Sequence, residues 1–213
     1  MNSCVIFGAA PGATVPKGFS SDGALRICAD GGLTLAISLG ITPDIVIGDF
    51  DSAKEVPRGD WETIILPREK DDTDLLAAVK LALDRGCDDF TIPGALGGRL
   101  DHSLGNLAVL QFLAEQGVAG VLMDEMTQVF LRQAGDTPLL LENQKGKTLS
   151  VFPFGTETCI VTYRGLKYPM EHGQLQSDVP LGVSNIIREN KAEVLVERGT
   201  AVILLLELPE TTA

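Results

Sequence analysis

Acidic residues gather in three short stretches of the chain, each at a predicted junction between a strand and a helix. The stretch "ALRICAD" ends at Asp30, and "DIVIGDFD" ends with Asp49 and Asp51. The third stretch, "KDDTD", contains Asp71, Asp72 and Asp74. Carboxylates held close together repel one another, and Mg²⁺, a hard cation that binds carboxylate and phosphate oxygens, relieves that repulsion. The chemistry that these residues indicate is a magnesium-assisted reaction of a phosphate compound.

Each stretch has a simpler explanation when it is taken alone. Aspartates commonly form turns and helix caps, and an acid such as Asp74 in a first helical turn is favoured by the helix dipole. The pair Asp49 and Asp51 fits a turn as well as it fits a metal site. Their convergence favours the site, because the carboxyl ends of parallel strands meet at one edge, where ligands bind.

A glycine-rich segment, "GALGGRLDHSLGN" at 94–106, follows the apolar run "DFTIP". Its glycines would let main-chain N–H groups approach an anion, and Arg99 offers a fork of donors to a phosphate. Ordinary turn chemistry also explains the glycines. A helix cap is likewise the simpler alternative for Asp101. His102 receives only a supporting polar role because no nucleophile–base pair is visible.

The elements that must position these residues fall into two parts. Through about residue 120, β-rich runs alternate with helical patterns such as "TDLLAAVKLALDRG", for which Thr73 or Asp72 is the expected cap. This alternation predicts a mostly parallel sheet flanked by helices. The remaining short strands, separated by turn residues, predict an all-β sandwich. We therefore predict an α/β domain over 1–122 and a β-sandwich over 123–213.

Composition excludes several classes of function. The net charge of -12 and the pI near 4.5 oppose nonspecific binding to nucleic acid or to anionic membranes. Four dispersed cysteines and two histidines give neither a disulfide framework nor a zinc site, and the short apolar run at the start predicts a cytoplasmic protein. The chain also lacks GxxxxGK[ST], and "FGAAPGAT" is a poor GxGxxG, which disfavours a P-loop or a dinucleotide site.

Taken in order, these motifs resemble the thiamine pyrophosphokinase family, in its bacterial form. The order and spacing of the matching pieces are much more specific than any one piece, and the pieces extend over nearly the whole chain. They are "ADGG" at 29–32, "GITPDIVIGDFDS" at 40–52, "KDDTD" at 70–74, "GALGGRLDH" at 94–102, Asn106, "GLKYPM" at 165–170 and "SN" at 184–185.

The resemblance implies a thiamine diphosphokinase, which transfers the diphosphoryl group of ATP to the thiamine hydroxyl and gives thiamine diphosphate and AMP with Mg²⁺. It implies that 1–122 binds ATP, that 123–213 binds thiamine and dimerises, and that the active sites of a homodimer lie between subunits. The implied metal ligands are Asp49, Asp51 and Asp74. The other implied site residues are Asp30 and Asp101 among the catalytic acids, Gly31, Asp71, Thr73, Arg99 and His102 on the ATP side, and Ser184 and Asn185 at thiamine.

Two other functions stay open on sequence alone. A thiamine- or nucleotide-sensing protein could use the same fold without catalysis, although it would not need this many acids. A phosphohydrolase of the haloacid dehalogenase type is suggested by "DFDSA", but that motif normally follows the first strand and has Thr or Val where Ala53 stands. The only tryptophan, Trp61, lies in the predicted first domain, so the aromatic partner of the thiamine rings is not identified.

Overall fold

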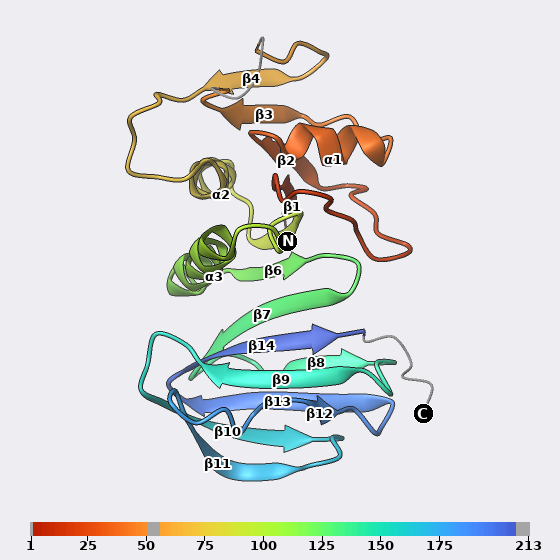
Figure 1. Ribbon diagram of the computed structural model, residues 1–213, viewed down its shortest axis with the longest axis vertical. Helices are drawn as coiled ribbons and strands as arrows, with labels where there is room; N and C mark the ends of the chain where they lie inside the picture. The colour runs from red at the N-terminus through yellow and green to blue at the C-terminus, as the bar shows by residue number, and fades with distance from the viewer. Residues whose placement is uncertain (1, 51–55, 208–213) are drawn as a thin grey trace. The chain divides into compact units, whose positions relative to one another are not determined.

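A computed structural model describes residues 2–50 and 56–207, and the chain divides into two compact units, Met1–Glu125 and Met126–Ala213 (Figure 1). Asp51 therefore lies outside the described residues. No helix in the described ranges is long and apolar enough to cross a membrane.

The first unit is built on a parallel sheet. Each neighbouring pair of strands is parallel, in the order β6-β5-β1-β2-β3-β4. The strands are β1 (Ser3–Phe7), β2 (Leu25–Ala29), β3 (Ile45–Gly48), β4 (Glu62–Ile65), β5 (Asp89–Pro93) and β6 (Ala119–Met123). Most of their side chains in the centre of the sheet are buried, as expected for a sheet covered on both faces. The predicted mostly parallel sheet is confirmed.

Within the described residues, this sheet is covered by helices α1 (Gly32–Ser38), α2 (Asp74–Asp84) and α3 (Leu100–Glu115). Helix α1 packs on β1 and β2, where Leu35 and Ala36 join Phe7 in a buried cluster. Helix α2 packs on β1, β2 and β3 and contacts α3, which lies beside β6. In Figure 1, α1 lies on one side of the strands and α2 and α3 lie on the other.

The second unit is a sandwich of two antiparallel sheets, as predicted. One sheet has the order β12-β9-β14-β7 and the other β11-β10-β13-β8. Their facing side chains form one buried core, which includes Val161, Ile187, Val194 and Ile203. The strands are β7 (Thr127–Gln133), β8 (Leu139–Glu142), β9 (Thr148–Pro153), β10 (Thr158–Arg164), β11 (Met170–Gln176), β12 (Asn185–Ile186), β13 (Lys191–Arg198) and β14 (Thr200–Leu206).

Candidate active site

The parallel sheet brings Asp30 and Asp49 to neighbouring strand ends. Asp30 follows β2, and its N–H donates a hydrogen bond to the Ile47 carbonyl of β3 over 2.8 Å. Gly48 ends β3 so close to Asp30 that an added Cβ would lie 3.1 Å from the Asp30 Cα. Asp49 comes directly after this contact. The sheet thus places two of the acids of the sequence motifs side by side at its carboxyl edge.

Lys70 joins the acid that follows β3 to the acid that begins α2. Its ammonium Nζ lies 2.7 Å from Asp49 Oδ2 and 3.1 Å from Asp74 Oδ1. The side chains are largely withdrawn from solvent, with 16% of Asp49, 16% of Lys70 and 24% of Asp74 exposed. The hydrogen bond to Asp49 raises the pKa of Lys70, against the opposing effect of burial, so the lysine is a cation at neutral pH.

The donor set around Lys70 suits a hard divalent cation. Asp74 Oδ1 is buried, and the polar group that lies against it is the Lys70 ammonium, at 3.1 Å. A buried carboxylate oxygen in this state favours a cation beside it. Among the described residues no group of three His, Cys, Asp or Glu side chains has metal-binding geometry. The third predicted ligand, Asp51, is outside that range.

The start of α2 is fixed by Thr73, whose hydroxyl accepts a hydrogen bond from the Leu76 N–H over 3.2 Å. Of the two residues expected to cap this helix, Thr73 is therefore the one that does so. Asp72 instead pairs with Lys80 over 2.7 Å, while Asp71 is exposed. The cap holds the first turn of α2, and with it Asp74, against the sheet edge.

Two loops meet where the strand order reverses, between β1 and β5. Gly8 N–H donates to the Pro93 carbonyl over 2.8 Å, and Ala10 N–H donates to the Gly94 carbonyl over 2.9 Å. A Cβ on Gly8 would lie 2.5 Å from the Gly94 oxygen, so a larger residue does not fit there. Ligands of open α/β sheets bind at such a reversal. The glycine-rich segment predicted to face phosphate lies at this position.

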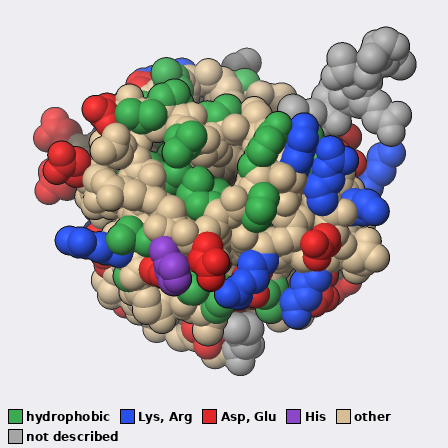
Figure 2. Space-filling view, turned by 90° about the horizontal axis from the view of Figure 1, so that it is seen from below, with side chains coloured by type: hydrophobic (Ala, Val, Ile, Leu, Met, Phe, Trp, Pro, Cys, Tyr) green, Lys and Arg blue, Asp and Glu red, His purple; other side chains and the backbone are tan. Residues whose placement is uncertain are grey.

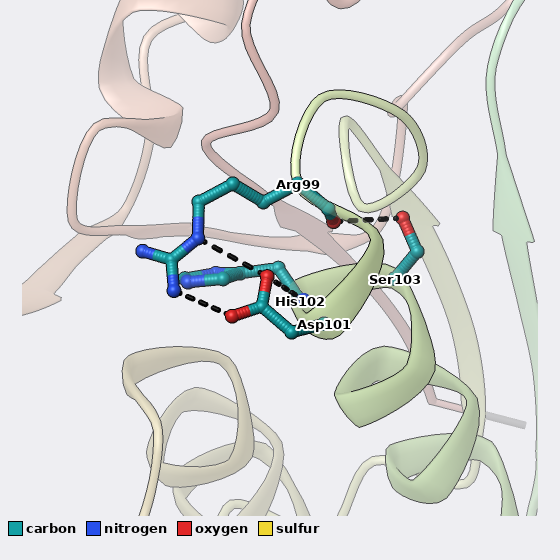
Figure 3. A network of polar contacts seen from close by, with 4 residues as sticks. All are labelled: Arg99, Asp101, His102 and Ser103. Carbon is teal, nitrogen blue, oxygen red and sulfur yellow. Dashed lines mark hydrogen bonds and ion pairs between the residues drawn. The ribbon is translucent and has the colours of Figure 1, made fainter.

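Arg99, Asp101 and His102 form a compact network at the start of α3 (Figure 3). The Arg99 guanidinium donates to both Asp101 oxygens, over 3.1 and 2.5 Å, and the His102 N–H donates to Asp101 Oδ1 over 3.0 Å. The hydrogen bond from Arg99 lowers the pKa of Asp101 to about 2. Arg99 is 71% exposed, so part of its donor fork faces solvent.

The alternative role of Asp101 as a helix cap is wrong. Helix α3 begins at Leu100 with Arg99 in the N-cap position, and Asp101 lies within its first turn. The Asp101 carboxylate instead accepts two hydrogen bonds from the Arg99 guanidinium, in a charge-assisted pair that uses both carboxylate oxygens. Asn106, one of the motif residues, donates to the Ala95 carbonyl over 2.7 Å and ties the glycine-rich loop to α3.

In the second unit Asn185 serves the main chain. Its Oδ1 accepts hydrogen bonds from the N–H groups of Tyr168 and Ile186, over 3.0 and 2.9 Å, and its Nδ2 donates to the Tyr168 carbonyl over 2.8 Å. Asn185 is 8% exposed. Ser184, in contrast, is exposed and has a positive φ of 60°. The amide of Asn185 therefore orders the chain around Tyr168, and the Ser184 side chain faces outward.

Comparison with known proteins agrees with both units. Residues 18–121 match the family model "Thiamin pyrophosphokinase, catalytic domain", and residues 139–201 match "Thiamin pyrophosphokinase, vitamin B1 binding domain". The thiamine pyrophosphokinase of Bacillus subtilis is 30% identical over 188 residues, which cover 86% of this chain and 84% of that protein. The chain belongs to the thiamine pyrophosphokinase family. This confirms the resemblance read from the ordered motifs.

Solved structures of thiamine pyrophosphokinases share the fold. The Bacillus subtilis crystal structure superposes with a TM-score of 0.84 at 25% identity, over 96% of this chain and 99% of that one. The Candida albicans structure gives 0.74 at 14% identity, over 97% and 89%. The second likeness concerns the fold alone.

The structure indicates two candidate site residues, Lys70 and Tyr168, to which the sequence motifs gave no role. Lys70 is part of the motif "KDDTD" but received no role. Its place four residues before Asp74 is a signal in the sequence that could have predicted their contact. Tyr168 is part of the motif "GLKYPM"; the residue is 59% exposed, and Asn185 holds its main chain. An exposed aromatic side chain, held through the residue that follows Ser184, is the expected kind of surface for a flat heterocycle.

Proposed function

We propose that this chain works as a thiamine diphosphokinase whose phosphate chemistry takes place at the carboxyl edge of its parallel sheet. Family membership carries the activity, and the observation that supports its location is the pairing of Asp49 and Asp74 through one ammonium. These carboxylates, with Asp51 as a further predicted ligand, would hold Mg²⁺. When bound, the ion would supply charge neutralisation to the phosphates of ATP.

The reaction is a displacement at the β-phosphorus of ATP. The thiamine hydroxyl oxygen bonds to that phosphorus, the bond from the phosphorus to the oxygen bridging the α-phosphate breaks, and AMP leaves while the hydroxyl proton is released. Catalysis of this kind depends on alignment and on stabilisation of phosphate charge. Arg99 supplies exposed donors for a phosphate, and Asp101 orients the guanidinium through two hydrogen bonds.

On the thiamine side we assign binding to Ser184 and Tyr168. The Ser184 hydroxyl would hydrogen-bond the substrate, and the Tyr168 ring would stack on one of its heterocycles. Asn185 acts through Tyr168, because its amide is committed to that residue's main chain. We propose that the ATP side of the site also includes Asp30, Gly31, Asp71, Thr73 and His102, as the motifs predict.

A cytoplasmic location stays a prediction from the sequence.

We further propose a homodimer in which the thiamine segment of one subunit completes the ATP site of the other. Support for the dimer comes from the exposed apolar residues that precede Ser184: Val179, Leu181 and Val183 are 46%, 62% and 47% exposed. Apolar side chains grouped in one exposed segment commonly mark an interface.

The proposal is tested by phosphorus NMR of the pure protein with ATP, Mg²⁺ and thiamine, beside mixtures that lack one component. We expect AMP and thiamine diphosphate in equal amounts only when all three are present. In Asp49→Asn, turnover should fall by at least about a hundredfold because a metal ligand is lost. Free phosphate without thiamine would instead indicate a hydrolase, and binding of both substrates without AMP would indicate a sensor.

A further inference from the structure

Lys70 lies where the proposed function requires a metal ion. Its ammonium contacts Asp49 and Asp74 at 2.7 and 3.1 Å, and 16% of its side chain is exposed. The two acids belong to different segments, one after β3 and the other at the start of α2. One ammonium therefore contacts carboxylates from two separate segments and reduces the repulsion between them.

A divalent cation and an ammonium cannot share this position. Mg²⁺ bound by oxygens lies about 2.1 Å from each of them, a shorter separation than the present Lys70 contacts, and it carries twice the charge of the lysine. Like charges at such short range repel strongly in a partly desolvated site. Lys70 must leave the two carboxylates when the metal enters.

We propose that Lys70 is an internal counter-cation that occupies the Asp49–Asp74 position in the free protein and moves to a phosphate oxygen of ATP when Mg²⁺ takes that position. The inference rests on the proposed metal site. It makes Lys70 a determinant of binding order, because metal alone must displace a bound ammonium, whereas metal arriving with ATP offers that ammonium a new anionic partner. Metal and nucleotide therefore bind with positive coupling, and the coupling is reciprocal.

Lys80 provides a matched control. It is a lysine of α2 whose ammonium also contacts an acid of the same motif, Asp72, at 2.7 Å, but 45% of its side chain is exposed. It contacts one carboxylate residue instead of bridging two segments. Lys80→Met removes the same charge from the same region without uncovering Asp49 and Asp74.

The test is Mn²⁺ binding to the nucleotide-free protein, followed by the electron paramagnetic resonance signal of free Mn²⁺ at about pH 8, where carboxylates are ionised. Lys70→Met should bind Mn²⁺ at least about tenfold more tightly than the unaltered protein, because the competing charge is gone. Lys70→Arg and Lys80→Met should keep the low affinity. With the α,β-methylene analogue of ATP present, the difference in Mn²⁺ affinity between Lys70→Met and the unaltered protein should shrink. In the unaltered protein Lys70 then contacts a phosphate and no longer competes with Mn²⁺ for the two carboxylates.

The outcomes separate this inference from the metal site on which it rests. Asp49→Asn in the Lys70→Met background should remove the gain in Mn²⁺ affinity. If Asp49→Asn weakens Mn²⁺ binding with the ATP analogue but Lys70→Met gains nothing without nucleotide, the counter-cation role is wrong and the metal site stands. If Asp49→Asn changes Mn²⁺ binding neither with the ATP analogue nor without nucleotide, the proposed metal site itself is wrong. Circular dichroism on each variant confirms that it is folded.

Discussion

At the scale of single residues, the acids of the sequence motifs divide into two kinds by their partners. Asp49 and Asp74 lie against an ammonium in a largely covered position, whereas Asp101 lies in the open beside Arg99. An ammonium is a compact charge that a metal ion can replace, while a guanidinium holds a carboxylate in a planar, two-bonded geometry. The first pair is suited to exchange of cations, and the second to a fixed orientation.

The Arg99–Asp101 pair leads to a pH-dependent prediction. The pKa of Asp101 is lowered to about 2, below an ordinary value of about 3.9, so the folded protein favours the ionised form. Its contribution to stability is complete above the ordinary pKa and is lost as the pH falls from about 4 towards 2. Asp101 is thus a carboxylate throughout the neutral range and cannot act there as a general acid.

Carbon-13 NMR of the Asp101 carboxyl group during acid titration checks this. In Arg99→Met the midpoint should rise towards the ordinary value of about 3.9, because the main hydrogen bond to the carboxylate is gone. Arg85→Met, which removes the exposed partner of Glu62, serves as the control and should leave Asp101 unchanged. An unchanged midpoint in Arg99→Met would show that the pair does not persist in solution.

At the scale of elements, short apolar runs and helix patterns were enough to predict the parallel sheet, its helices and the sandwich. Thr73 was foreseeable as a cap because a threonine precedes the apolar spacing of α2. The contact of Lys70 with Asp49 was not foreseeable, since it joins residues 21 positions apart, one directly after β3 and the other between β4 and α2. The role of Asn185 was also hidden, because "VSN" does not reveal that its amide serves the Tyr168 main chain.

The contact between the loops after β1 and β5 gives an element-scale prediction. Gly94 has a φ of 71°, and a Cβ there would lie 2.7 Å from the Gly8 carbonyl oxygen. Gly94→Ala should lower the free energy of unfolding by about 2–4 kcal/mol, through left-handed backbone strain together with steric overlap. Gly97 has a φ of 89° but nothing within 4 Å of its added Cβ, so Gly97→Ala should cost only about 1 kcal/mol.

Urea unfolding followed by the fluorescence of Trp61, the only tryptophan and a residue of the first unit, measures both variants. Trp61 packs against the buried cluster that contains Phe7 and Leu35, so its emission reports the sheet that these loops connect. Equal losses in the two alanine variants would mean that backbone conformation alone matters and that the loops do not need their close approach.

At the scale of the whole molecule, the second unit combines a completed core with apolar side chains left outside it. The core of the sandwich is closed by residues of both sheets, yet Tyr168 and Leu181 are 59% and 62% exposed. Figure 2 shows hydrophobic side chains over the upper and middle part of one face, with charged side chains at its sides and across its lower part. Apolar side chains grouped on an exposed face are a common feature of interfaces. This grouping supports a second copy of the chain as the partner.

Sedimentation equilibrium tests the homodimer, which should have twice the chain mass of 22.6 kDa. Leu181→Glu should shift the protein to monomers and lower its turnover together, because a charge buried in an apolar interface is unfavourable and the active site is shared. Leu140→Glu, at a position 50% exposed on β8, is the matched control and should stay dimeric.

Since each chain carries a net charge of -12, added salt should strengthen the dimer by screening repulsion between subunits. A fully active monomer at every salt concentration would rule out a shared active site.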